Sequence, residues 1–337
     1  MNDTILNDRQ KQMLNILEGK GSLSRLEITK LLSGKKLISR ITAIRDLNNL
    51  IDQNLIMQAG SARAKVYSLE KTNPLLKFID IENYFKNDMD NRNAKPSFDN
   101  DVFKNLTNLF LNKEIVFWND SSKEFKFRIT NLDKSIYKRE LERFVIEFSW
   151  KSAQIEGNTY DLLETETLFT QNIEAKGHSH EEAVMLINHK KAFDTILKNK
   201  ESFKELNFTD VIQLHGVLTK NLISSGIRSQ NIELGNNLKK IIDVINKTAF
   251  PPEKALIASS MIAYLQPFAD GNKRTARTLA NAILLAYDYF PLSYRNVDVN
   301  EYRRSLLLFY EQNNLFYLKK MFTDQLKFAL DNYFRLN

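Results

Sequence analysis

Most of the residues that could bind a charged ligand lie in one short stretch between two apolar segments. Residues 266–277 read QPFADGNKRTAR. Gly271 allows a tight turn, after which the N–H groups of residues 272–274 would point outward at the positive end of a helix, where anions bind. Arg274 and Arg277 are three positions apart and therefore share a helix face. Two guanidinium groups on one face suit a polyphosphate.

An acidic residue in the same stretch adds a metal ligand. Asp270 places a carboxylate at the rim of the loop, which suits Mg²⁺ bridging to phosphate oxygens. Phe268 is the apolar anchor that would hold the loop down. We therefore predict a site for a nucleotide with Mg²⁺. Its predicted nucleotide-binding residues are Gly271, Asn272, Lys273, Arg274 and Arg277, and its metal ligand is Asp270.

The stretch resembles the signature of the Fic (Fido) family, His-x-Phe-x-Asp/Glu-Gly-Asn-x-Arg-x-x-Arg. Six of its seven defined positions match, namely Phe268, Asp270, Gly271, Asn272, Arg274 and Arg277. The resemblance implies a protein adenylyltransferase, which transfers AMP from ATP to a Ser, Thr or Tyr hydroxyl of a target protein. It assigns catalytic roles to Asp270, Asn272, Arg274 and the residue at position 266.

The seventh position is the departure from the family. The family has a histidine there, which accepts the hydroxyl proton during attack on the α-phosphate, whereas this chain has Gln266. A glutamine amide can form hydrogen bonds but cannot take up a proton, and loss of a general base typically costs about 10²–10⁴ in rate. His215 is expected to lie in the core on another helix. We therefore expect nucleotide binding with impaired turnover. A natural replacement and an introduced one are both consistent with the sequence.

An upstream element supports the resemblance. Residues 152–157 read SAQIEG and fit the inhibitory pattern Ser/Thr-x-x-x-Glu-Gly/Asn of Fic proteins, with Ser152, Glu156 and Gly157 at the defined positions. The resemblance implies that Glu156 pairs with Arg277, which would otherwise hold the γ-phosphate of ATP. The alternatives are an ordinary structural salt bridge and a glutamate without a partner.

Two further features follow from the resemblance. A short β-hairpin flap before the motif, which would dock the backbone of the target protein, is assigned to residues 226–228 and 231–237. After the motif, Tyr302 and Tyr310 could line the pocket of the base, because an aromatic face can stack on a purine. Packing of both tyrosines in the core is the alternative.

The elements that must position these residues are mainly helical. Apolar spacing and capping signals predict one helix after another in the C-terminal part of the chain. We expect a winged helix-turn-helix domain over residues 1–70, a mostly helical connector over 71–140 and a Fic domain over 141–337. The Fic domain should be all-α, with about eight helices, the short β-hairpin flap and the inhibitory helix near residues 141–157.

The first 70 residues are predicted to form a small α+β domain. Helices that start near residues 8, 24 and 39 are followed by two short strands around a turn, an order that resembles winged helix-turn-helix regulators. This part holds 11 Lys and Arg against 7 Asp and Glu, in a chain of net charge +7. We therefore predict DNA contacts by Arg40, Thr42, Arg45, Arg63 and Lys65. A solvated face of a protein-interaction module is the alternative.

This N-terminal part supplies a second hypothesis for the function. A Fic core that only senses ATP or ADP, joined to a DNA-binding winged helix, would be a transcription regulator. Gln266 favours this hypothesis, because sensing requires nucleotide binding and no general base. The two hypotheses are compatible, since an active enzyme could also control its own promoter.

The composition and the first residues of the chain bear on its possible chemistry and on its location in the cell. The chain has no cysteine and four histidines, which excludes disulfides, thiolate catalysis and Cys-ligated metal sites. No signal peptide and no apolar stretch of membrane length are visible. We therefore expect a cytoplasmic protein that does not bind membranes, and a homodimer is possible.

Overall fold

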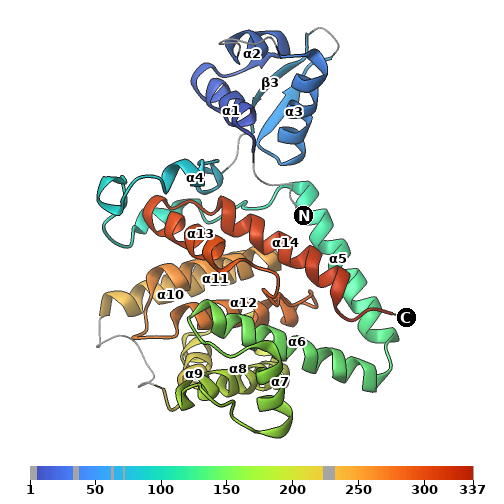
Figure 1. Cartoon of the computed structure of the whole chain (residues 1–337), viewed down its shortest axis with the longest axis vertical. Coiled ribbons are helices and arrows are strands. Elements are labelled where there is room, and N and C mark those ends of the chain that lie inside the picture. Colours follow the sequence, from blue (N-terminus) through green and yellow to red (C-terminus); the bar gives the residue numbers. More distant parts are fainter. Residues whose placement is uncertain (1–5, 33–37, 62–63, 71–72, 223–231, 337) are drawn as a thin grey trace. The chain divides into compact units, whose positions relative to one another are not determined.

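In the computed structural model, the chain forms two compact units (Figure 1). The structure describes residues 6–32, 38–61, 64–70, 73–222 and 232–336. The first unit contains the described parts of residues 1–73 together with 77–91. The second contains residues 74–76 and the described parts of 92–337, and it carries the loop with the predicted nucleotide site.

The first unit packs three helices against a small antiparallel sheet. Its regular elements are α1 (Asp8–Lys20), β1 (Leu23–Ser24), α2 (Arg25–Leu32), α3 (Arg40–Asp52), β2 (Ile56–Ala59) and β3 (Val66–Leu69). The strand order is β1-β3-β2, with Ile56 opposite Leu69. The side chains of Asn7 and Ser39 cap α1 and α3 by accepting from N–H groups of the first turn. The predicted order of three helices and a β-hairpin is confirmed, and β1 is an additional strand.

An apolar core holds the first unit together. Met13 of α1, Ile28 of α2 and Leu47 of α3 are completely buried, as their helical spacing predicts. Asp46 is buried beside them and forms an ion pair with Arg9 of α1, as a buried carboxylate requires. The outward side of α3 is left to solvent.

The segment between the first helices and the C-terminal bundle has its long helix in the second half. From residue 74 to residue 105 the chain forms only short helical turns, at Pro74–Leu76, Ile81–Tyr84 (α4), Met89–Asn91 and Asn100–Asn105. A long helix, α5 (Asn112–Asn131), follows and is anchored by the buried side chains of Trp118 and Phe125. The mostly helical connector is therefore helical mainly in its second half.

The second unit continues as a helical bundle. Its further helices are α6 (Lys134–Ile155), α7 (Leu162–Gln171), α8 (His180–Lys198), α9 (Phe208–Thr219), α10 (Ile232–Lys247), α11 (Pro251–Leu265), α12 (Asn272–Ala286), α13 (Val299–Gln312) and α14 (Phe316–Asn332). The mainly α fold predicted from the sequence is confirmed. No described helix combines the length and the hydropathy needed to span a bilayer.

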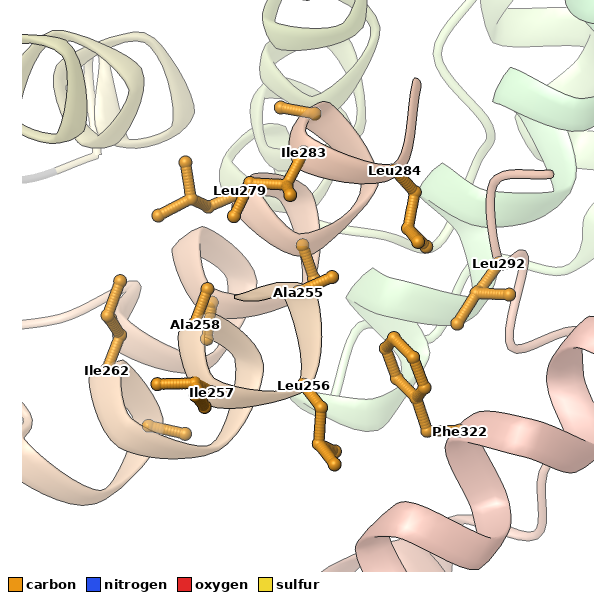
Figure 2. Packing of buried hydrophobic residues seen from close by; sticks show 14 of the residues in the cluster. Ala255, Leu256, Ile257, Ala258, Ile262, Leu279, Ile283, Leu284, Leu292 and Phe322 are labelled. Atoms are coloured by element: carbon orange, nitrogen blue, oxygen red, sulfur yellow. The ribbon is translucent and has the colours of Figure 1, made fainter. Parts of the chain in front are cut away.

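Helices α11 and α12 form the centre of this bundle (Figure 2). Nearly every side chain of both helices is buried, and Ala255, Ala258, Leu279 and Ile283 belong to their shared core. A helix that is covered on all sides needs apolar or small residues on all sides. The loop that joins α11 to α12 is therefore held at both ends by helices whose side chains are almost all buried.

The predicted flap differs from the structure. Residues 232–237, expected in a β-hairpin, form the first turns of α10. Leu238, Ile241 and Ile242 recur at helical spacing and are buried on one side of α10, which explains the helix. The remainder of that prediction, residues 226–228 and 231, lies outside the described residues. Within the described part of the second unit, no β-strand is present.

Candidate functional site

The loop between α11 and α12 changes direction through two residues with left-handed backbone. Gln266 follows α11 with φ 48° and ψ 57°, and its N–H donates to the carbonyl of Ile262. Gly271 precedes α12 with φ 74° and ψ 8°. The first turn of α12 contains no acidic residue. Its unpaired N–H groups and the helix dipole therefore make this end of α12 electropositive.

Gly271 is required both by its backbone and by its surroundings. Its positive φ favours glycine. A Cβ atom at this position would also lie 2.8 Å from Cγ2 of Thr219 and 3.4 Å from Nη2 of Arg274. The loop thus packs directly against the C-terminal end of α9.

The side chain of Asn272 forms two hydrogen bonds with the backbone of the loop. Its Oδ1 accepts from the N–H of Phe268 at 2.8 Å, and its Nδ2 donates to the carbonyl of Phe268 at 2.9 Å. The predicted role of Asn272 was to hold phosphates. That role stays a prediction; the structure shows that the Asn272 amide helps to fix the shape of the loop, and that Phe268 is the buried anchor that was expected.

His215 lies directly beneath the loop. Its ring stacks on Phe268 with centroids 3.7 Å apart and an angle of 6°, and its Nδ1 lies 3.3 Å from Oγ1 of Thr275. Its Nε2 is buried and has no hydrogen-bond partner among the described residues. Burial, with the nearby charge of Arg274, lowers the pKa of His215 to about 4, so the ring is neutral at pH 7. The sequence predicted a core histidine but gave no sign that α9 places it under the motif.

Lys273, Arg274 and Arg277 place three positive charges in the first turns of α12. Arg274 is almost fully buried; its Nη2 donates to Asp270 at 2.7 Å and its Nη1 donates to the carbonyl of Leu218 at 3.4 Å. Burial lowers the pKa of Arg274, and the Asp270 carboxylate opposes that shift. Much of the hydrogen-bonding capacity of Arg274 is therefore already used by the protein.

Asp270 fits the predicted role of a magnesium ligand. Its side chain is 61% exposed at the rim of the loop, although one oxygen accepts from Arg274. Mg²⁺ commonly binds through one or two carboxylates together with phosphate oxygens, so the exposed carboxylate of Asp270 is compatible with that role. Among the described residues, no group of three or more His, Asp or Glu could hold a metal ion without such a ligand.

Arg277 is completely buried and has partners from two other helices. Its Nε and Nη2 donate to Oγ and the carbonyl of Ser152 at 3.1 and 2.8 Å. Its Nη2 also donates to Oε1 of Glu156 at 2.9 Å, and its Nη1 donates to the hydroxyl of Tyr302 at 3.3 Å. The structure therefore brings Ser152 and Glu156 of the predicted inhibitory segment onto Arg277.

Glu156 lies at the C-terminal end of α6 and contacts a second cation. Its Oε2 is 3.5 Å from Nζ of Lys273. Burial acts to raise the pKa of Glu156, but Arg277 and Lys273 more than offset this and hold it below its ordinary value. The carboxylate is therefore charged at neutral pH. Gly157, with φ 101°, then turns the chain away from the site.

His189 orients Ser152 toward Arg277, a role that sequence reasoning missed. Its Nδ1 lies 2.9 Å from the carbonyl of Met185, and its Nε2 lies 3.1 Å from Oγ of Ser152. Burial lowers the pKa of His189 to about 3, so the ring carries one proton. Because a carbonyl only accepts, that proton is on Nδ1, and Nε2 accepts from the Ser152 hydroxyl. The remaining lone pairs of Ser152 then face the donors of Arg277.

The two predicted base-pocket tyrosines have different positions. Tyr302 is buried, and its ring lies beneath the guanidinium of Arg277 at 5.5 Å. Tyr310 stacks on Tyr264 with centroids 5.6 Å apart. Its hydroxyl is buried near Gln266 without a hydrogen bond of normal geometry. Both rings thus take part in packing, the alternative that the sequence had left open.

The predicted DNA-contacting residues belong to the first unit. Arg40 and Arg45 are exposed on α3, and Thr42 and Lys65 are half-buried. The N–H of Thr42 donates to the capping oxygen of Ser39. The fifth residue, Arg63, lies outside the described residues.

Comparisons with known proteins agree with this fold and motif. A model of the Fic/DOC family matches residues 183–284, from α8 to α12. Protein adenylyltransferase fic-1 of Caenorhabditis elegans is 28% identical over 166 residues, which are 43% of this chain and 32% of the relative. Protein adenylyltransferase Fic of Nematostella vectensis is 26% identical over 186 residues, 49% and 43% of the respective chains. The matched region thus spans less than half the length of these curated relatives.

Solved structures extend the likeness to the fold. Fic-1 from C. elegans superposes with a TM-score of 0.57 at 22% identity, covering 66% of this chain and 71% of that one. A Fic family protein from Desulfovibrio desulfuricans gives 0.52 at 19% identity, covering 66% and 74%. The second unit is thus a helical domain with an electropositive loop at its central helix. Its helices α8 to α12 match the model of the Fic/DOC family, and its fold is similar to that of solved Fic proteins.

Replacing Gly271 tests the packing of the loop. We expect Gly271→Ala to lower the free energy of unfolding by about 1–3 kcal/mol, because it adds both a left-handed alanine and a close contact with Thr219. Thr219→Ser removes that contact and keeps the hydroxyl bond to the His215 carbonyl. The double variant should recover part of the loss in denaturant unfolding. Gly271→Ala with unchanged stability would contradict the proposed packing.

Proposed function

We propose that the second unit binds ATP with Mg²⁺ at the loop between α11 and α12 and is built to transfer AMP to a protein hydroxyl. The observation that carries this proposal is the electropositive start of α12, where Gly271 turns the chain and Arg277 is held by Ser152 and Glu156. The adenylyltransferase names of the relatives support the reaction. The target would be a protein with an accessible Ser, Thr or Tyr hydroxyl.

In the proposed reaction, the protein contributes mainly positioning and charge. The first N–H groups of α12 and Arg274 would hold the inner phosphates, while Asn272 keeps the loop in shape. Asp270 would hold Mg²⁺, which when bound neutralises charge on phosphate oxygens. The hydroxyl oxygen bonds to the α-phosphorus as the bond to pyrophosphate breaks, and in this chain the hydroxyl proton would pass to solvent water. Gln266 can orient the hydroxyl but cannot accept that proton.

We further propose that Glu156 inhibits the reaction. Its carboxylate uses the N–H of Arg277 that the terminal phosphate of ATP would need. Because the pKa of Glu156 is held below its ordinary value, the ion pair is fully formed above the pKa of an unfolded glutamate. It is lost only as the pH falls through the lowered value. The closed form is therefore expected throughout the neutral range.

Incorporation of labelled AMP into the protein itself and into a protein lysate tests this proposal. We expect background incorporation by the unchanged chain and an increase of about 10²–10⁴ for Gln266→His, because a base is supplied. Glu156→Gly should raise the Gln266→His rate further. Gln266→Asn is the matched control, since it keeps an amide, and should stay at background. Equal activity of the unchanged chain and Gln266→His would contradict the role given to position 266.

A second candidate function is nucleotide-responsive DNA binding. The exposed Arg40 and Arg45 on α3, in a unit of three helices and a small sheet, favour it. Gln266 also favours it, because sensing needs no base. In this case the Fic domain would report ATP or ADP, and the first unit would bind an operator.

DNA affinity, measured at about 100 mM salt with and without nucleotide, tests this candidate. Arg45→Ala should weaken binding by about tenfold, because a phosphate or base contact is lost. Lys138→Ala, which removes a charge 77% exposed on α6, is the control and should have little effect. Because linkage is reciprocal, nucleotide must change DNA affinity and DNA must change nucleotide affinity by the same factor. If neither the DNA affinity nor the nucleotide affinity changes, nucleotide-responsive DNA binding is excluded.

A further inference from the structure

Lys273 and Arg277 hold the two oxygens of one carboxylate. Nζ of Lys273 lies 3.5 Å from Oε2 of Glu156, and Nη2 of Arg277 lies 2.9 Å from Oε1. The two cations are four positions apart on α12 and therefore share a face. Arg277 has no exposed surface, whereas the Lys273 side chain is 38% exposed. Solvent and ligands thus reach this pair from the Lys273 side.

Arg277 by itself has few donors left for a phosphate. A guanidinium has five N–H groups. Three of those in Arg277 are directed at Ser152 and Tyr302, and one more is directed at Glu156. The edge formed by Nε and Nη2, which would give a bidentate grip on a phosphate, already faces Ser152. If Glu156 moves away, a phosphate in its place needs a second cation.

The position of Lys273 in the helix also points to a ligand. Lys273 is the second residue of α12, at the positive end of the helix dipole and beside Arg274. A cation at this end is unfavourable for helix stability. In the closed form, the contact with the Glu156 carboxylate offsets this unfavourable charge of Lys273. When Glu156 has moved away, a ligand anion in the place of its carboxylate would offset the same charge.

We propose that Lys273 is shared between two states: it holds Glu156 in the closed form and the terminal phosphate of the nucleotide in the open form. A carboxylate and a phosphate both present two anionic oxygens side by side, so the pair of cations that fits one fits the other. The flexible stem and three donors of a lysine allow the exchange. This inference rests on the proposed nucleotide binding and assigns a residue that discriminates ATP from AMP.

Calorimetric titration of four proteins with ATP and Mg²⁺ tests the inference. The proteins are the unchanged chain, Lys273→Met, Glu156→Gln and the double variant. In the Glu156→Gln background, Lys273→Met should weaken ATP binding by about tenfold or more, because a charged hydrogen bond is lost. In the unchanged chain, Lys273→Met should reduce ATP affinity much less, or should increase it. The reason is that loss of Lys273 also releases Glu156, which competes with the phosphate. AMP affinity should change less than about twofold in both backgrounds.

Two control variants test whether the change in ATP affinity comes from Lys273 itself rather than from the loss of any positive charge or from a folding defect. Lys191→Met removes an exposed lysine on α8 and should leave ATP affinity unchanged. Lys273→Arg keeps the charge and should keep ATP affinity within about threefold. An equal loss in both backgrounds, or no loss with Glu156→Gln, would overturn the inference while leaving the proposed function intact. Absence of ATP binding in all four proteins would overturn both.

Discussion

The buried charge of Arg277 sets the conditions that the surrounding helices must meet. A guanidinium without exposed surface is costly unless anions or carbonyls surround it. Its partners Ser152, Glu156 and Tyr302 come from α6 and α13, so one side chain of α12 links three helices. Removing a partner leaves charge uncompensated. The site is therefore expected to contain an anion at all times, either Glu156 or a ligand.

The shape of the loop is independent of these charges. Asn272 ties the loop to Phe268, and Phe268 rests on the neutral ring of His215. None of these groups is ionised at pH 7, so their contacts do not change when a charged ligand arrives. The chain thus separates the residues that hold the backbone from those that bind charge. Such pre-organisation lowers the cost of binding, because the loop need not reorder.

Sequence reasoning grouped the predicted site residues because they follow one another in the loop after α11 and in the first turns of α12. Arg274 and Arg277 share a face by spacing alone, and the Glu156–Arg277 contact followed from the family resemblance. His189 and His215 were not connected with the site, because the packing of distant helices brings them there. The bonds of Asn272 to the backbone of Phe268 were not foreseen, because an amide can bind either a ligand or the backbone. For residues 232–237, which were predicted as part of the flap, the helical spacing of the apolar residues from Leu238 onward was the signal that could have indicated a helix.

Position 266 has left-handed backbone, with φ 48° and ψ 57°. This residue ends α11, where its N–H donates to the carbonyl of Ile262. Histidine is among the residues enriched in that conformation. Codons for glutamine and histidine differ only in their last base. A change between glutamine and histidine at position 266 therefore needs a single base substitution, and it alters a side chain outside the Asn272–Phe268 bonds that shape the loop.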